Sequence, residues 1–107
     1  MSYQLFVRPE VEADIAEAEV WYEQRVEGLG RDFSRVIRDA LRELPGNPLI
    51  YRLRHRRLGI RWFYPPRFPY RIVYRIEGES IVALAVLHAK QHDRHWRKVS
   101  VTGSTTG

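Results

Sequence analysis

The spacing of the apolar residues in this chain of 107 residues changes at Pro45-Gly46-Asn47-Pro48. Between Pro9 and this segment, apolar residues recur every three or four positions, as on one face of a helix. Downstream, they alternate with polar ones, as on one face of a strand. The prolines fit this boundary because proline cannot continue a helix. The pattern predicts an α+β domain with the element order β-α-α-β-β-β.

The first half of the chain predicts a short strand followed by two helices. Residues 3–7 alternate, and Pro9 then suits the first position of a helix, where its missing N–H costs nothing. A helical stripe follows at Val11, Ile15, Ala18 and Tyr22. Gly28-Leu29-Gly30 interrupts it, and a second stripe begins near Arg31 and runs to Leu44. A break this short predicts an antiparallel helix hairpin.

The second half predicts a three-stranded antiparallel meander. Residues 60–64 and 70–77 have the alternation of strands, and Gly78 marks a turn. Residues 80–89 are apolar at both parities, which is typical of a central strand covered on both faces. Residues 51–57 form either a further strand or a basic loop. Together with the N-terminal strand, we expect one mostly antiparallel sheet packed against the helix hairpin.

The length and composition fit a single domain. We expect residues 1–98 to form it and residues 99–107 to be a flexible tail, because VSVTGSTTG is too small and polar to fold alone. The chain has no cysteine, which excludes disulfides, cysteine–zinc sites and thiol catalysis. The N-terminus lacks the apolar core of a signal peptide, and no apolar run reaches the roughly 18 residues of a membrane span. We therefore expect a cytoplasmic protein without a membrane segment.

The net charge of +5 conceals opposite charges in the two halves. Residues 1–49 hold ten acidic and six basic side chains, whereas residues 50–107 hold three acidic and twelve basic ones. A basic half suggests an anionic partner, either a nucleic acid or an acidic protein segment. The alternative is a protein that simply has a high isoelectric point. The acidic side chains of the first helix are expected to be solvated.

Three histidines near the end of the last strand, His88, His92 and His95, would share one face if this segment were a helix. Three neutral imidazoles are able to ligate zinc. However, His88 follows directly from a predicted strand, and a strand does not bring these spacings together. We therefore expect no metal site and no cofactor.

The aromatic residues are numerous enough to suggest stacking on nucleic-acid bases. Their spacing on the predicted helices and strands nevertheless favours positions in the core. We expect Trp21 and Tyr22 to pack against the sheet, and Trp62 and Tyr64 to be buried because they share the parity of Ile60.

The order and lengths of these elements, together with the segment FPYRIVYRIEGESIVALAVLHAKQHDRHW, resemble the RelE/ParE superfamily of bacterial type II toxins, also called plasmid stabilisation system proteins. The resemblance covers about residues 3–98. It implies a small cytoplasmic toxin encoded beside a ParD-like antitoxin, whose C-terminal segment wraps the toxin. It also implies that the complex contacts operator DNA only through the antitoxin.

The superfamily divides by target, and RelE-type members are metal-independent ribonucleases that cut mRNA on the ribosome. Such cleavage needs a base, an acid and cations that stabilise the phosphate. His88, Lys90, Arg61 and Arg71 are the candidates for these roles if they converge on one sheet face. His88 and Lys90 would point the same way if the strand continued past His88.

Two departures favour the ParE-type branch, whose characterised members inhibit DNA gyrase. RelE-type members carry a Gly-Lys-Arg-like stretch and then a tyrosine; Lys90 matches the lysine, but the arginine position falls at Gln91 and the tyrosine position near Trp96 or Arg97. The segment VLHAKQHD follows the ParE-type pattern instead. We expect a gyrase inhibitor that acts by binding rather than an enzyme. A ribosome-dependent mRNA endonuclease and an inactive antitoxin-binding member are the alternatives.

We expect the antitoxin or the target to bind basic residues of the second half, namely Arg52, Arg54, Arg56, Arg57, Arg61, Arg71, Lys90 and Arg94. Arginine suits carboxylates and phosphates alike because its planar fork pairs with two oxygens at once. The alternative for the run at 52–57 is a solvated edge strand whose charge prevents aggregation.

Overall fold

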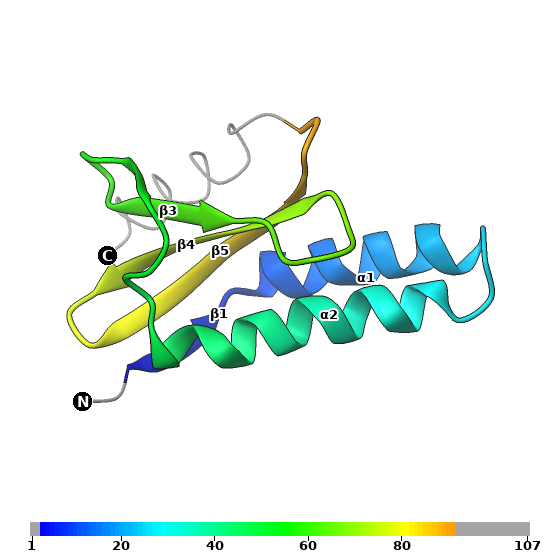
Figure 1. Ribbon diagram of the computed structural model, residues 1–107, viewed down its shortest axis with the longest axis horizontal. Coiled ribbons are helices and arrows are strands. Elements are labelled where there is room, and N and C mark those ends of the chain that lie inside the picture. The colour runs from blue at the N-terminus through cyan, green and yellow to red at the C-terminus, as the bar shows by residue number, and fades with distance from the viewer. Residues whose placement is uncertain (1–2, 92–107) are drawn as a thin grey trace.

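The computed structural model describes residues 3–91, which form two helices, one 3-10 turn and five strands (Figure 1). In chain order they are β1 (Gln4–Val7), α1 (Pro9–Glu23), α2 (Leu29–Glu43), η1 (Leu44–Gly46), β2 (Leu53–His55), β3 (Ile60–Phe63), β4 (Tyr70–Glu77) and β5 (Ser80–His88). The α+β class, the helix hairpin and the three-stranded meander β3-β4-β5 are confirmed. The boundary expected between residues 98 and 99, and the tail beyond it, lie outside the described residues.

All five strands belong to one sheet in the order β1-β5-β4-β3-β2. β1 pairs with β5 in parallel, and every other pairing is antiparallel. The prediction of a central strand at residues 80–89 is therefore confirmed, because β5 lies between β1 and β4. Of the two alternatives for residues 51–57, a short strand forms, β2, and it lies at the edge of the sheet.

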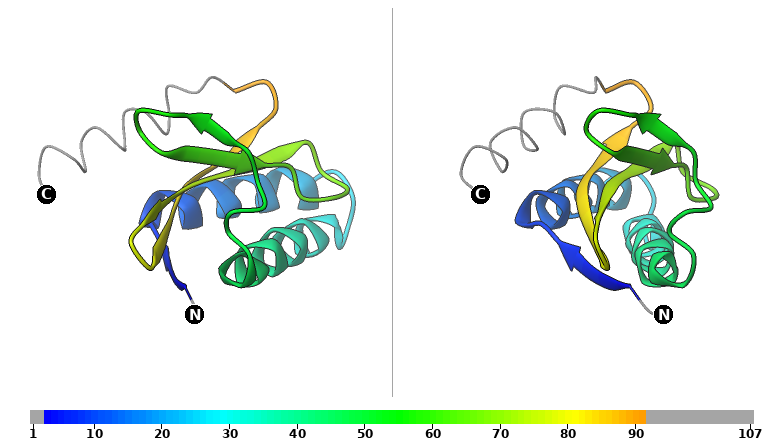
Figure 2. Two further views of the ribbon diagram at one scale, coloured as in Figure 1. Left: turned by 60° about the vertical axis from the view of Figure 1, so that its left-hand side comes forward. Right: turned by 90° about the vertical axis from the view of Figure 1, so that its left-hand side faces the viewer.

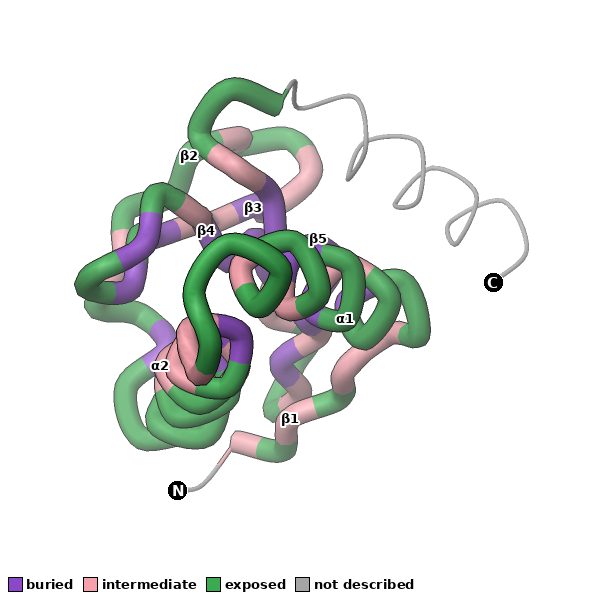
Figure 3. The backbone as a smooth tube through the Cα atoms, turned by 90° about the vertical axis from the view of Figure 1, so that its right-hand side faces the viewer, coloured by how far each residue is buried: buried purple, intermediate pink, exposed green. Residues whose placement is uncertain are grey.

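Both helices cover the same face of the sheet, as the turned views in Figure 2 show. We call this the helix face; its buried residues include Ile72, Tyr74 and Val86, which pack with the inner sides of α1 and α2 (Figure 3). The opposite face, here called the second face, carries a separate buried cluster formed by Ile60, Val73, Leu84, Ala85 and Leu87. The two clusters explain why the sequence of β5 is apolar at both parities.

The alternation of β5 is interrupted by one extra residue, Leu84. Val73 lies opposite Ala85 and Tyr74 lies opposite Ala83, so Leu84 has no partner of its own on β4. This is a β-bulge, and it shifts the parity of everything after it. Ala83 faces the helices before the bulge, whereas Val86 faces them after it.

The turn between the helices is built on Gly28 and Glu23. Gly28 has φ of +85°, a conformation that glycine adopts without strain, and α2 begins directly after it at Leu29, slightly earlier than the predicted Arg31. The carboxylate of Glu23 accepts hydrogen bonds from the N–H groups of Gly28 (2.8 Å) and Gly30 (2.9 Å). These bonds hold the pKa of Glu23 below its ordinary value.

The aromatic residues are only partly where the sequence pattern places them. Tyr22 packs as expected, with its ring near those of Phe33 and Phe68. The expectation for Trp21 is wrong, because this residue is 48% exposed and is not packed into the core. Tyr64 is also half-exposed, since it lies just beyond the end of β3, whereas Trp62 is partly buried against the cluster of the second face.

None of the helices formed by residues 3–91 is long and apolar enough to cross a membrane.

Replacing Gly30 with alanine tests the close packing of the two helices. A Cβ atom at this position would lie 2.4 Å from the backbone oxygen of Glu19, so the helices would have to move apart. We expect the free energy of unfolding, measured by urea denaturation, to fall by about 1–3 kcal/mol. Gly46→Ala is the matched control, because a Cβ atom added there would have no other atom within 4 Å. An equal, small effect of both substitutions would contradict this account.

Candidate functional site

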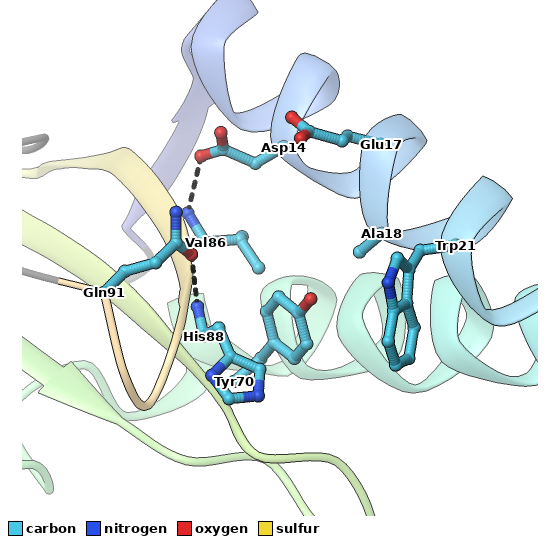
Figure 4. A pocket seen from close by; sticks show the side chains of 8 residues that line it. All are labelled: Asp14, Glu17, Ala18, Trp21, Tyr70, Val86, His88 and Gln91. Atoms are coloured by element: carbon cyan, nitrogen blue, oxygen red, sulfur yellow. Dashed lines mark hydrogen bonds between the residues drawn. The ribbon is translucent and has the colours of Figure 1, made fainter.

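The residues after β5 form a closed turn, and His88 and Gln91 hold it together. The N–H of His88 donates to Oε1 of Gln91 (2.6 Å), and the N–H of Gln91 donates to the carbonyl of His88 (2.9 Å). The N–H of Lys90 donates to Nδ1 of His88 (3.0 Å). Figure 4 shows the Gln91 side chain folded back toward His88. Because Nδ1 is an acceptor in this turn, we assign the neutral imidazole proton to Nε2.

The side chain of Arg71 also holds this turn, through hydrogen bonds to two of its carbonyl groups. Its side chain is only 4% exposed; Nη1 donates to the carbonyl of His88 (3.3 Å) and Nη2 to the carbonyl of Gln91 (3.1 Å). Its guanidinium lies 5.5 Å from the centre of the Trp62 ring. A guanidinium that already serves two carbonyls in a buried position has a structural role in this conformation.

Arg61 is also engaged with the backbone. Its Nη1 donates to the carbonyl of Tyr51 (2.5 Å), and the hydroxyl of its cross-strand neighbour Tyr74 donates to the carbonyl of Pro48 (2.5 Å). Burial raises the pKa of Tyr74 to about 12, so its hydroxyl keeps its proton and remains a donor. These two bonds fasten the segment between η1 and β2 to the sheet.

The four residues proposed for RNA cleavage are not brought together on one face. His88 lies on the helix face, with its ring 5.2 Å from that of Tyr70, whereas Arg71 lies beside Leu87 on the second face. Arg61 lies on the helix face opposite Tyr74, several residues along β4 from His88. The strand ends at His88, so Lys90 is an exposed turn residue and does not share a strand face with it.

The arginines of residues 51–57 form an exposed basic edge. Arg52, Arg54, Arg56 and Arg57 are all exposed on or beside β2. Large apolar side chains accompany them, with Leu49, Ile50, Leu53 and Tyr64 between 39% and 63% exposed. A pocket of about 220 Å³ opens beside this segment, lined partly by Ile50, Tyr51, Phe63 and Tyr64. We call this combined surface the β2 edge.

Some predicted positions fall outside the part of the chain that the structure describes. These are Arg94 of the basic set, His92 and His95 of the histidine triplet, and Trp96. Within residues 3–91, no group of three or more His, Asp or Glu side chains is placed to hold a metal ion.

Sequence reasoning missed the structural use of Gln91, which it treated only as the place of a missing arginine. It also missed the Asp14 carboxylate, which accepts the N–H of Val86 at 2.9 Å. A carboxylate bordering an apolar helical stripe was the available signal, but its partner depends on the register of a strand more than seventy residues away.

The fold is similar to those of solved bacterial toxins. A chain of the chromosomal ParDE toxin–antitoxin system from P. aeruginosa shares 19% identity at a TM-score of 0.69, covering 80% of this chain and 95% of that one. A chain of the toxin–antitoxin complex RelBE2 from Mycobacterium tuberculosis shares 23% identity at a TM-score of 0.56, and the match covers 82% of this chain and 99% of that one. A mutant of the E. coli toxin RelE in the free state shares 16% identity at a TM-score of 0.58, and the match covers 96% of this chain and 98% of that one. These similarities define the RelE/ParE toxin fold.

Comparison of the sequence with models of protein families identifies one family within this fold. The family described as the ParE toxin of the type II toxin-antitoxin system, parDE, matches residues 5–93. The chain therefore belongs to the ParE toxin family, within the RelE/ParE superfamily. Among curated protein sequences, none matches it.

Replacing Arg71 with methionine tests its role in the turn at residues 88–91. The substitution removes both donors while keeping much of the apolar stem, so the carbonyls of His88 and Gln91 each lose the hydrogen bond from Arg71. We expect a loss of about 1–3 kcal/mol in the free energy of unfolding and faster hydrogen exchange at the amides of Lys90 and Gln91. Arg57→Met, an exposed position, is the control. Unchanged exchange in Arg71→Met would show that the turn does not depend on this side chain.

Proposed function

We propose that this protein is a ParE-like toxin that inhibits DNA gyrase by binding it, acts in the cytoplasm, and is neutralised by a ParD-like antitoxin encoded beside it. The observation that carries this proposal is the turn at residues 88–91. Gln91 occupies the position where the resemblance to ribonuclease members places an arginine, and its side chain closes the turn instead of facing a substrate. An inhibitor that acts by contact does not need the convergent acid, base and cations that RNA cleavage requires.

The second candidate function is ribosome-dependent cleavage of mRNA. The exposed side chains of Lys90 and of the four arginines of the β2 edge favour it, because they are available to phosphates. It would require Arg71 to leave the two carbonyls that it binds and His88 to leave the acceptor role of its Nδ1. That rearrangement is why we rank cleavage below inhibition.

A supercoiling assay tests the first proposal. Purified toxin is expected to reduce the supercoiling of relaxed plasmid by gyrase in a dose-dependent way, and toxin premixed with its antitoxin is expected to have no effect. Full gyrase activity at a large excess of toxin would count against the proposal. Toe-printing of a translated mRNA in the same preparation tests cleavage, where new 5′ ends that vanish in His88→Ala would support the endonuclease. A chain that neither inhibits gyrase nor cuts mRNA, and does not slow growth when expressed alone, would be an inactive antitoxin-binding member.

The β2 edge fits the antitoxin as a partner. An exposed edge strand offers unpaired backbone groups to which an extended segment adds as a further strand. The alternation of exposed arginines with Leu53 and the neighbouring pocket would accept a segment that is acidic on one side and apolar on the other. Tyr74 and Arg61 support this surface from the sheet through the carbonyls of Pro48 and Tyr51.

Removing two charges from the β2 edge tests this assignment. The double variant Arg56→Gln and Arg57→Gln is expected to weaken binding of the antitoxin, measured by calorimetry, by about tenfold or more, because charge-assisted hydrogen bonds are lost. The double variant Arg35→Gln and Arg42→Gln removes the same charge from exposed positions on α2, where both side chains form ion pairs with nearby aspartates. Equal weakening by both doubles would indicate a general effect of charge and not a site.

A further inference from the structure

A pocket of about 270 Å³ lies between α1 and the ends of β4 and β5, away from the β2 edge. Asp14, Glu17, Ala18 and Trp21 line it from the helix, and Tyr70, Val86, His88 and Gln91 line it from the sheet and the turn (Figure 4). We call it the α1 pocket. Residues three, four and seven positions apart share one side of a helix, which is why one flank of α1 supplies four of the lining residues.

The shape of the α1 pocket follows from the bulge and from one small residue. The bulge at Leu84 turns His88 toward the helix face, so its ring and that of Tyr70 form one wall. The small side chain of Ala18 leaves space at the bottom of the pocket. The half-exposed ring of Trp21 lies on the side of the pocket away from His88. Asp14 fixes the spacing between helix and strand by accepting the N–H of Val86, beyond the point where β1 ends. The cavity is below the usual size of a cofactor site and suits a single side chain.

The charge of the α1 pocket is opposite to that of the chain as a whole. Asp14 and Glu17 bring two carboxylates to it, and the pKa of Tyr70 is raised by burial first and then by Tyr22, Glu17 and Asp14. Among the described cations, Arg25 lies over the Trp21 ring at 3.5 Å and donates to the Trp21 carbonyl. Arg71 is on the second face of the sheet, and no ion pair to Glu17 occurs among residues 3–91. The negative charge of Glu17 therefore faces the pocket and solvent.

We propose that the α1 pocket binds the side chain of an arginine from a partner protein. A guanidinium would pair with the Glu17 carboxylate through its planar fork, and its apolar stem would lie between the rings of Trp21 and Tyr70. Phosphates and other anions are repelled by the carboxylates, and a neutral apolar side chain would leave the negative charge of Glu17 without a counter-ion. Tryptophan, tyrosine and arginine are also the residues most enriched at the centres of protein interfaces.

This inference is independent of whether gyrase or mRNA is the target. It adds a second recognition point, of opposite charge to the β2 edge, at the ends of β4 and β5, which β3 separates from β2. A partner that used both surfaces would need an acidic segment and, separately, an exposed arginine.

Nuclear magnetic resonance titration of the full ¹⁵N-labelled chain tests the proposal with Nα-acetyl-argininamide as the probe. We expect saturable shifts of the Trp21 indole signal, which is assigned by its absence in Trp21→Ala, and of the amides of Val86 and His88. Nα-acetyl-citrullinamide has nearly the same shape without the charge and should produce no saturable shift. Nα-acetyl-lysinamide should bind more weakly, because it lacks the planar fork.

Two variants separate the pocket from general charge effects. Glu17→Gln should weaken binding of the arginine probe about tenfold, since one charge-assisted pair is lost. Glu27→Gln, an exposed position at the end of the hairpin, should leave the affinity within about twofold. Both side chains are exposed, so both variants should give the spectrum of a folded protein. Binding of the citrulline compound or the lysine compound as tightly as the arginine compound would overturn the proposal. So would equal affinities in the two variants.

Discussion

The structure depends on β5, which lies inside the sheet between β1, the first strand of the chain, and β4. It joins β1 in parallel and β4 antiparallel, and its side chains reach both buried clusters. A strand placed in this way is apolar on both faces, because its side chains are buried on both of them. His88 is the first polar residue of this strand after Ser80, and polar side chains reach the surface at His88 and in the turn that follows it.

The turn shows how residues of catalytic type are used for architecture. A histidine and an arginine that meet at the end of one strand invite an acid–base interpretation, but here each is bonded to the backbone of the same four residues. The guanidinium reaches the turn from the second face, while the imidazole accepts from the other side. Rigid placement of this kind suits a contact surface, because ordering it on binding would cost little conformational entropy.

The periodicity of the sequence predicts β1, both helices and the meander β3-β4-β5, since the change from 3.6 to 2 at Pro45–Pro48 and the glycines at 28 and 30 are local signals. It leaves β2 open between a strand and a loop. The details of the site were not predictable in the same way. In a strand that is apolar at both parities, the sequence does not indicate which residues face which side of the sheet. The bulge at Leu84 therefore cannot be predicted from the sequence. The sequence pattern wrongly predicts that Trp21 is buried, because this residue lies next to the apolar stripe of α1. Whether such a residue is buried or exposed depends on how the helix packs against the sheet.

The bulge also affects how this chain can be compared with its relatives. In an unbroken strand Leu87 would follow Ala83 and Ala85 onto the helix face, and His88 would lie on the second face; the inserted Leu84 exchanges them. Counting residues back from the end of the strand therefore assigns roles correctly only between proteins that share the insertion. Two toxins with the same residues at the end of this strand can direct them to opposite faces of the sheet. Equivalent residues in this family therefore have to be identified from the strand register before the role of any residue is transferred.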